Sequence, residues 1–296
     1  MKRYLLRIFL FFFIVAIVDF IFGKSCDYLY KQVKTGDSKD NYAVFNSITA
    51  DIIVIGSSRS CHHYNSQILS DSLHLSCFNC GSDGLGIFNM YGRLVSICQR
   101  KIPKIVIYDV FAPNELYDLD NFRDLDGLKP FCNDDSISSI LCKVNPIEKI
   151  KLASRLYRYN TKIFQIVRDL LVNKSQKING FEPLYKTMDY TPSPFRSKYD
   201  NKDPDSLKLK YVYKVIELSK KKKFKLFFSI SPWYQATNDD DYTVLKEICK
   251  KEGITLINYY TKKDINTNKE LFADPAHLNA SGADVFSKQI VSFLKD

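Results

Sequence analysis

Short apolar segments alternate with helical patterns along most of this chain. Five strand candidates, rich in β-branched and aromatic residues, occupy residues 51–55, 75–79, 104–110, 224–230 and 254–258. Helical patterns lie between or after them, at residues 86–100, 206–223, 239–252 and 283–294. Continuous apolar strands joined by helices are typical of a parallel sheet that is covered on both faces. We therefore predict a three-layer α/β fold of flavodoxin-like order, in which sites form at the carboxyl ends of the strands.

The N-terminus carries a long apolar segment. Residues 4–23 are interrupted only by Arg7 and Asp19, and a membrane-spanning helix needs about 20 such residues. Because Lys2 and Arg3 precede the segment, the positive-inside rule places the N-terminus in the cytoplasm and the rest of the chain outside. No small-x-small cleavage site follows, which favours a retained anchor over a cleaved signal peptide. Asp19 is unusual here; we place it near the outer interface, with a contact to another membrane protein as the alternative.

The composition of the chain changes at several points. Residues 1–24 form the predicted anchor, residues 25–49 a polar stalk, and residues 50–296 one α/β domain. A mostly helical insertion at about residues 117–200 interrupts the domain, and its window 143–177 holds nine basic residues against two acidic ones. Apolar residues recur at helical spacing in that window. We favour a helix docked on the domain with a solvated basic face, and a helix lying on an anionic membrane is the alternative.

Charge and cysteine content narrow the classes of partner. The net charge is +10, but no nucleic-acid-binding motif accompanies it, so we predict no nucleic-acid partner. All eight cysteines follow the apolar segment, and an exported domain permits disulfides whose pairing the spacing does not determine. Cys77 and Cys80 form a C-x-x-C without a second pair at zinc-site spacing. We interpret them as core-strand residues and predict no metal site.

Polar residues follow the predicted strands at four places. The first strand runs into the Gly-Ser-Ser-Arg block of residues 56–59. Gly81 follows the second strand and Asn114 the third. Asp274 and His277 come after the last strand, three residues apart. Because the carboxyl ends of parallel strands meet at one edge of a sheet, we expect these segments to lie together.

The residue types in these segments suit nucleophilic catalysis. An alcohol nucleophile needs a base, and the base needs a partner that orients it. Ser58 can supply the alcohol, His277 can take its proton, and Asp274 can hold the imidazole tautomer. An acyl-transfer transition state also needs donors where negative charge develops. The backbone N–H groups of Ser58 and Gly81 and the side-chain amide of Asn114 are candidates for this oxyanion hole.

Together, these segments resemble the SGNH, or GDSL-type, hydrolase superfamily over about residues 51–295. In that family a Gly-Asp-Ser-like block after the first strand carries the nucleophile, and a late Asp-x-x-His completes the triad. The segment DPAHLNASGADVFS is the most specific match. The resemblance implies the SGNH hydrolase fold, a triad of Ser58, His277 and Asp274, and an oxyanion hole that includes Gly81 and Asn114.

Three positions depart from the family pattern. Ser57 stands where the family has an aspartate, Arg59 follows the nucleophile, and residues 112–115 read Ala-Pro-Asn-Glu instead of Gly-x-Asn-Asp. The last departure makes Asn114 a weaker match than the triad. With its N-terminal anchor, the chain most resembles membrane-tethered bacterial members that handle acyl groups on envelope glycans. This resemblance implies a single-pass protein of the inner (cytoplasmic) membrane with an extracytoplasmic catalytic domain.

Several other residues are candidates for substrate binding. Arg59 can bind an anionic substrate group or, as we favour, a loop carboxylate. His62 can line the pocket, although core packing is the default, and its neighbour His63 points to a different face, which argues against a metal pair. Trp233 and Tyr234 can form a wall on which a sugar stacks, or they can pack under the proline-rich loop.

Simpler interpretations compete for the first polar block. Ser57, Ser58 and Ser60 could cap a helix, and a helix N-terminus also attracts phosphate. The block lacks the Walker lysine and the Gly-x-Gly-x-x-Gly pattern. The Gly-x-Ser-x-Gly elbow of α/β-hydrolases is also missing from the sequence. The joint order of the four polar segments favours a catalytic site in which Ser57 and Ser60 support Ser58.

The sequence thus predicts a membrane-anchored extracytoplasmic enzyme that hydrolyses or transfers an O-acyl group, most simply acetyl. The expected substrate is an acylated carbohydrate of the cell envelope or a small ester, and the mechanism needs neither a metal nor an organic cofactor. The alternative is a catalytically inactive SGNH module that binds glycan or an assembly partner. Whether water or a sugar hydroxyl accepts the acyl group is left open by the sequence.

Overall fold

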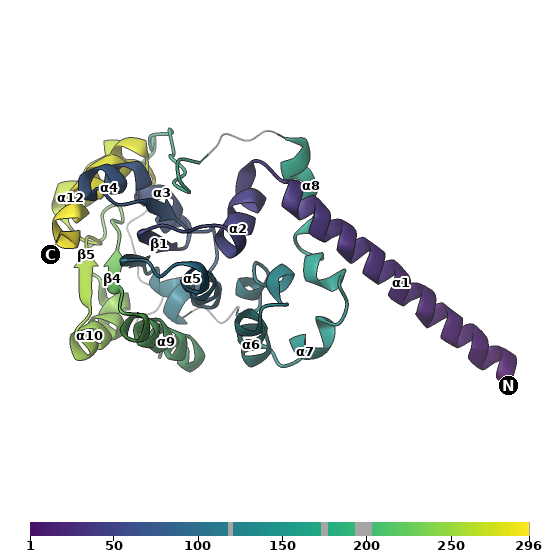
Figure 1. Ribbon diagram of the computed structural model, residues 1–296. Coiled ribbons are helices and arrows are strands. Elements are labelled where there is room, and N and C mark those ends of the chain that lie inside the picture. The colour runs from purple at the N-terminus through teal and green to yellow at the C-terminus, as the bar shows by residue number, and fades with distance from the viewer. Residues whose placement is uncertain (118–120, 173–176, 193–202, 296) are drawn as a thin grey trace. The chain divides into compact units, whose positions relative to one another are not determined.

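The computed structural model describes residues 1–117, 121–172, 177–192 and 203–295. The chain forms two compact units (Figure 1). Unit 1 comprises Met1–Ala43 and Leu125–Gln176, and unit 2 comprises Val44–Asp124 and Lys177–Asp296.

Unit 2 contains a five-stranded sheet with the strand order β2-β1-β3-β4-β5. All of its pairings are parallel. The strands are β1 Ile52–Gly56, β2 Cys77–Asn79, β3 Ile105–Asp109, β4 Lys225–Ile230 and β5 Thr255–Asn258. This is the flavodoxin-like order, so the predicted α/β fold class is confirmed.

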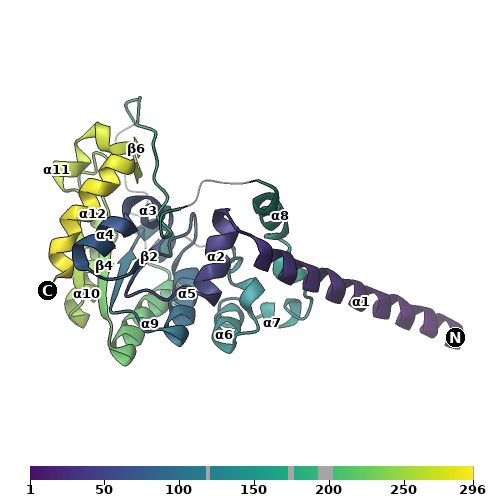
Figure 2. The same cartoon turned by 45° about the horizontal axis from the view of Figure 1, so that its top comes forward.

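Helices cover both faces of the sheet (Figures 1 and 2). One layer contains α3 Ser58–His63, α4 Ser66–Leu73 and α12 Ala280–Leu294, and the other contains α5 Ile87–Arg100, α9 Ser206–Lys222 and α10 Thr243–Glu252. The predicted strands and helices correspond to these elements, with ends that differ by at most about one turn. A short antiparallel pair, β6 Phe272–Asp274 and β7 His277–Leu278, follows α11 Lys263–Asn266 and leads into α12.

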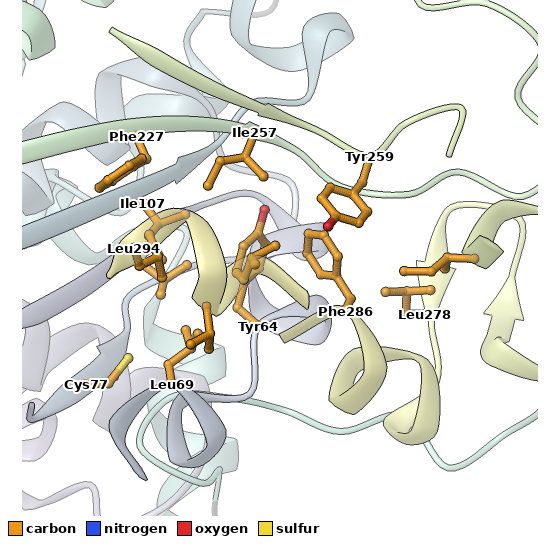
Figure 3. Packing of buried hydrophobic residues seen from close by; sticks show 14 of the residues in the cluster. Tyr64, Leu69, Cys77, Ile107, Phe227, Ile257, Tyr259, Leu278, Phe286 and Leu294 are labelled. Atoms are coloured by element: carbon orange, nitrogen blue, oxygen red, sulfur yellow. The ribbon is translucent and has the colours of Figure 1, made fainter. Parts of the chain in front are cut away.

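The core of the α3/α4/α12 layer is built from alternate strand residues, because successive side chains of a strand point to opposite faces. Figure 3 shows part of this packing, in which Phe286 of α12 lies between two tyrosines. Its ring centroid is 5.1 Å from that of Tyr64 and 5.2 Å from that of Tyr259. The strand residues of this core are Ile52, Val54, Cys77, Ile105, Ile107, Phe227 and Ile257.

Unit 1 contains α1 Lys2–Gln32, α6 Asp135–Val144, α7 Glu148–Lys151, α8 Ile163–Leu171 and most of α2 Gly36–Asn46. The helix α1 is long and apolar enough to cross a membrane. A signal sequence near an N-terminus has the same length and composition. Most of residues 25–49, which the sequence suggested as a polar stalk, are helical, since α1 continues to Gln32 and α2 follows. The physical reason is a stripe of Cys26, Tyr30 and Val33 that is buried against Tyr159 and Ile166.

The basic window 143–177 differs from the single helix that its periodicity indicated. The structure divides it into α7, a 3-10 turn at Tyr157–Tyr159, and α8. The break follows from hydrogen bonding, because the N–H groups of Arg155 and Leu156 donate to the carboxylate of Asp19 instead of to a preceding turn. Asp19 therefore has its polar partners within its own chain.

We expect the Phe286→Ala substitution to lower the free energy of unfolding by about 3–5 kcal/mol, because it removes a fully buried ring and leaves a cavity. Phe293→Ala on the same helix is the matched control, since Phe293 is 39% exposed. Its cost should be at most about half as large. Denaturant unfolding of the full chain measures both values, and equal costs would contradict the packing described here.

Candidate active site

The site begins where β1, β3 and β4 end. Gly56, Asp109 and Ser229 share one register row at the carboxyl edge of the sheet. Gly56 has a φ of +146°, and a Cβ there would lie 2.5 Å from the carbonyl oxygen of Asp109. Only glycine fits this turn without strain. The turn lets the chain leave the sheet and start α3 at Ser58.

Ser58, His277 and Asp274 form a continuous hydrogen-bonded chain. Nε2 of His277 lies 2.8 Å from Oγ of Ser58. Nδ1 of His277 lies 2.9 and 3.0 Å from the two carboxylate oxygens of Asp274. All three residues are partly exposed, so a ligand can reach them. The structure therefore brings together three residues that stand up to 219 positions apart in the sequence.

The carboxylate of Asp274 determines the tautomer of His277. An ionised carboxylate only accepts hydrogen bonds, so Nδ1 carries the proton and Nε2 is left to accept the hydroxyl proton of Ser58. The N–H groups of Ala276 and His277 donate to the same carboxylate. Burial alone would raise the pKa of Asp274, but the bonds from His277 and from these two backbone groups outweigh it and lower the pKa.

The helix-cap interpretation of the serines does not match the local geometry. Ser57 occupies the N-cap position of α3 but makes no side-chain cap bond. Its hydroxyl is buried and has no hydrogen-bond partner among the residues that the structure describes. The hydroxyl of Ser60 donates to Oδ1 of Asn79 at 3.4 Å. Ser58 is thus the serine whose hydroxyl faces the imidazole of His277.

Two residues predicted for the oxyanion hole lie on different segments. Gly81 lies against α3, and Asn114 follows β3. A Cβ on Gly81 would lie 2.8 Å from the backbone nitrogen of Cys61, so glycine is needed for the close approach. The N–H of Gly81 donates to Oδ1 of Asn79 at 3.0 Å. Asn114 lies in the π-helical turn Pro113–Tyr117, and its carbonyl accepts a bond from Nζ of Lys208 at 2.5 Å. Within the described part of the chain, no protein group forms a hydrogen bond with the side-chain amide of Asn114.

Asn79 is a functional candidate that our sequence analysis did not single out. Its Nδ2 donates to the carbonyls of Ser60 and Tyr64, at 2.7 and 3.1 Å, while its Oδ1 accepts the N–H of Gly81. The side chain therefore joins the end of β2 to α3. Its signal was present in the sequence as the first residue of an Asn-x-Gly at the end of a predicted strand.

Arg59 points into the protein rather than toward a ligand. The side chain is 1% exposed, and its Nε donates to the hydroxyl of Ser231 at 3.0 Å. Nη1 donates to the hydroxyl of Tyr242 at 3.3 Å, and the Asp109 carboxylate lies 3.9 Å away. Burial raises the pKa of Asp109, and Arg59 offsets part of that effect. This environment matches the structural role that we favoured for Arg59 over substrate binding.

The two histidines of α3 flank the imidazole of His277. The His62 ring centroid lies 5.5 Å from that of His277 and the His63 centroid 6.2 Å, both edge to face. His62 Nδ1 lies 2.7 Å from the carbonyl oxygen of Glu182. His63 is fully buried and its Nε2 accepts the N–H of Leu278, so burial lowers its pKa and keeps it neutral. His63 thereby fixes the start of the segment after His277.

Residues 177–192, from the predicted insertion, border the triad. The N–H of Glu182 donates to the carbonyl of Cys61 in α3, and the N–H of Ala280 donates to the carbonyl of Leu184. The segment also reaches β6, because the N–H of Met188 donates to Phe272. It therefore ties α3, which begins at Ser58, to the segment that carries His277. Sequence reasoning did not assign it to the site.

The aromatic pair proposed as a sugar wall is divided by the structure. Tyr234 is buried with its ring 5.4 Å from Phe272, so it belongs to the core and not to a wall. Trp233 is partly exposed and stacks on Phe111, with ring centroids 6.0 Å apart and an interplanar angle of 10°. Phe111 follows β3 and Trp233 follows β4, which places both beyond the carboxyl ends of these strands.

The part of the chain that the structure describes contains neither a cluster of metal-ligand residues nor a disulfide. In the parts of the chain that the structure describes, no group of three or more His, Cys, Asp or Glu residues is placed to hold a metal ion. The eight cysteines are free thiols, and Cys77 and Cys80 are buried at the end of the core.

Comparison with known proteins gives similarity in fold. No family model and no curated protein matches the chain. It is similar to a solved structure described as a lipolytic protein of the G-D-S-L family from Desulfitobacterium hafniense, with 11% identity, a TM-score of 0.40, and coverage of 81% of this chain and 97% of that one. An acetyl xylan esterase shares 13% identity at a TM-score of 0.43, covering 82% and 99%.

A structure described as an acylhydrolase from Bacteroides fragilis shares 10% identity at a TM-score of 0.40, covering 90% of this chain and 94% of that one. The chain is thus similar to solved GDSL-type lipolytic and acylhydrolase structures over most of its length. Identities and TM-scores of this size carry no assignment of activity. The function is therefore argued from the geometry of the chain's own residues.

We expect the Arg59→Lys substitution to lower kcat for an aryl acetate by up to ~10²-fold while KM stays within about twofold. Lysine cannot reproduce the forked contacts to Ser231 and Tyr242, so α3 and Ser58 should shift, whereas substrate contacts remain. Steady-state kinetics of the two proteins separate the parameters. A large rise in KM with kcat unchanged would mean that Arg59 binds substrate after all.

The lowered pKa of Asp274 determines the direction in which folding stability changes with pH. A carboxyl group whose pKa is lower in the folded than in the unfolded chain contributes stability that is fully present above about pH 4. That contribution is lost as the pH falls through the folded-state pKa. The Tm difference between the wild type and Asp274→Asn should therefore narrow below about pH 4. A difference that stays constant down to about pH 2.5 would contradict this assignment.

Proposed function

We propose that the chain is an SGNH-type enzyme that cleaves or transfers O-acyl groups. The hydrogen-bonded order Ser58, His277, Asp274 is the observation that carries the proposal. Both contacts lie within the distance range for proton transfer, and the tautomer of His277 leaves Nε2 free to act as a base. The position of the triad at the carboxyl edge of a parallel sheet agrees with the resemblance found in the sequence.

In the first half of the reaction, Oγ of Ser58 attacks the ester carbonyl while Nε2 of His277 takes the hydroxyl proton. Asp274 stabilises the imidazolium that forms. The tetrahedral intermediate then collapses, the ester C–O bond breaks, and His277 returns the proton to the leaving alcohol. The product of this half is an acyl ester on Ser58.

In the second half, water or a hydroxyl group of an acceptor attacks the acyl-Ser58 carbonyl. His277 again acts as the base and then returns the proton to Ser58. Water as the acceptor makes the chain a hydrolase, and a sugar hydroxyl makes it a transferase. The same residues serve both reactions, so the choice depends on which acceptor occupies the site.

The oxyanion needs N–H donors beside Ser58. The N–H of Ser58 is at the first position of α3, where no helical carbonyl can accept it, and no other described group does. The N–H of Gly81 would have to exchange Oδ1 of Asn79 for the oxyanion. The side-chain amide of Asn114 is the third candidate. Each such donor typically contributes ~10²–10³ in rate.

We further propose a carbohydrate ester of the cell envelope as the substrate. The stacked, partly exposed rings of Phe111 and Trp233 offer an apolar face of the kind on which sugar rings pack. The apolar helix α1 would hold the enzyme at the membrane, with unit 2 on the extracytoplasmic side.

The test is ester hydrolysis by the full chain in detergent or nanodiscs. Ser58→Ala should lower the rate of acetate release from an aryl acetate by at least ~10³-fold, because a triad without its nucleophile retains only the oxyanion hole and binding. Ser57→Ala is the matched control and should stay within about fivefold of wild type, since that hydroxyl bonds to no described group.

Equal rates for the wild type and Ser58→Ala would reject the enzyme and favour the inactive, glycan-binding module. If Ser58→Ala is inactive, adding an acetylated and a deacetylated glycan to the wild type distinguishes the two acceptors. Acetate release shows a hydrolase, and acetyl groups that appear on the second glycan show a transferase.

A further inference from the structure

Asp19 interrupts the apolar part of α1 and is fully engaged within unit 1. Its carboxylate accepts a bond from the hydroxyl of Ser154 and bonds from the N–H groups of Arg155 and Leu156, at 2.8 and 3.1 Å. Three donors satisfy a carboxylate that would otherwise be costly near lipid. The same bonds attach residues 154–156 to α1 at the level of Asp19.

Further contacts fix this attachment along the next two turns of α1. Gly23 lies so close to the following segment that a Cβ there would be 2.2 Å from Cβ of Arg155. The guanidinium of Arg155 lies 5.0 Å from the ring centroid of Phe20. The hydroxyl of Tyr159 donates to Asp27 at 2.5 Å. The turn after α7 therefore packs beside the end of the apolar segment 4–23.

The surface next to the attachment of residues 154–156 to α1 is apolar and basic. Ile147 is 51% exposed, Ile150 is 76% exposed, and Leu156 is 40% exposed. Lys149 and Lys151 of α7 are also exposed. Opposite charge is turned inward, because Glu148 is 2% exposed and accepts bonds from Tyr157 and Asn145.

We propose that residues 147–156, here called the membrane collar, lie on the surface of an anionic bilayer where α1 leaves it. The proposal rests on α1 crossing the membrane, as in the proposed function. Asp19 stands four residues before the end of the segment 4–23, which is about 6 Å along the helix axis. That distance matches the about 5–10 Å by which an interfacial segment sinks into the boundary between headgroups and acyl chains, where apolar side chains insert and lysines meet lipid phosphates.

Two observations indicate that lipid is what the membrane collar contacts. Its apolar residues continue the lipid-facing surface of α1, since every residue from Tyr4 to Val18 is exposed. Its outward charge is positive, which suits anionic headgroups. Because the hydrogen bonds to Asp19 attach the membrane collar to α1, the collar limits how far α1 enters the bilayer.

The test measures the depth of single tryptophans in the full chain. The chain has one tryptophan, Trp233, so Trp233→Phe gives a silent background. Ile150→Trp reports on the collar. Phe164→Trp in α8 is the matched control, because it is 83% exposed but its helix packs near Cys26–Val33 and bonds to Ser38 through Asp169.

Both proteins are reconstituted into phosphatidylglycerol vesicles that contain lipids brominated near the headgroup end of the acyl chain. Ile150→Trp fluorescence should be quenched at least about threefold more than Phe164→Trp fluorescence. Adding Lys149→Gln and Lys151→Gln should reduce that difference. Equal quenching of the two tryptophans would overturn the collar.

Two further measurements separate this inference from the proposed function. Vesicle flotation after an alkaline carbonate wash reports whether α1 is inserted, and loss of the protein from vesicles would overturn the anchor and the collar together. Acetate release by the wild-type chain in the same vesicles reports on the triad independently. An active enzyme with an unquenched collar would reject only this inference.

Discussion

The buried carboxylate of Asp109 is the group on which the candidate site at the carboxyl edge of the sheet depends. It is fully buried at the end of β3 and accepts bonds from the hydroxyl of Tyr64 and from the N–H and hydroxyl of Ser231. Arg59 reaches the same network through Ser231. A buried charge without partners costs several kcal/mol, so these partners are held together. Because Arg59 is next to Ser58 in the chain, this network also sets where the Ser58 hydroxyl lies.

The position of His277 depends on a separate set of contacts. His63 receives the N–H of Leu278, and Asn279 caps α12 by accepting the N–H of Gly282. A short turn between β6 and β7 then brings Asp274 beside His277. Ser58 and His277 are thus held by different elements that meet through α3, which places two adjacent residues, His62 and His63, against the His277 ring.

Much of this arrangement could be predicted from the sequence because the signals are local. The apolar strands, the Gly-Ser-Ser turn and the Asp-x-x-His spacing are short patterns whose geometry follows from backbone sterics and side-chain reach. The roles of Asn79 and of residues 177–192 could not be predicted, since both depend on contacts between segments far apart in the chain. The sequence left Tyr234 open between a sugar wall and packing, because a tyrosine after a strand suits either, and only the tertiary contact with Phe272 buries it.

What the sequence by itself determined is the order of the elements, the fold class that this order implies, and the residue types available for chemistry. Tertiary structure decided which hydroxyl faces an imidazole, that Arg59 turns inward, and that the basic window breaks where Asp19 captures its backbone N–H groups. The reason is that periodicity reports which residues are buried, whereas hydrogen-bond partners are chosen among all groups that the fold brings within reach.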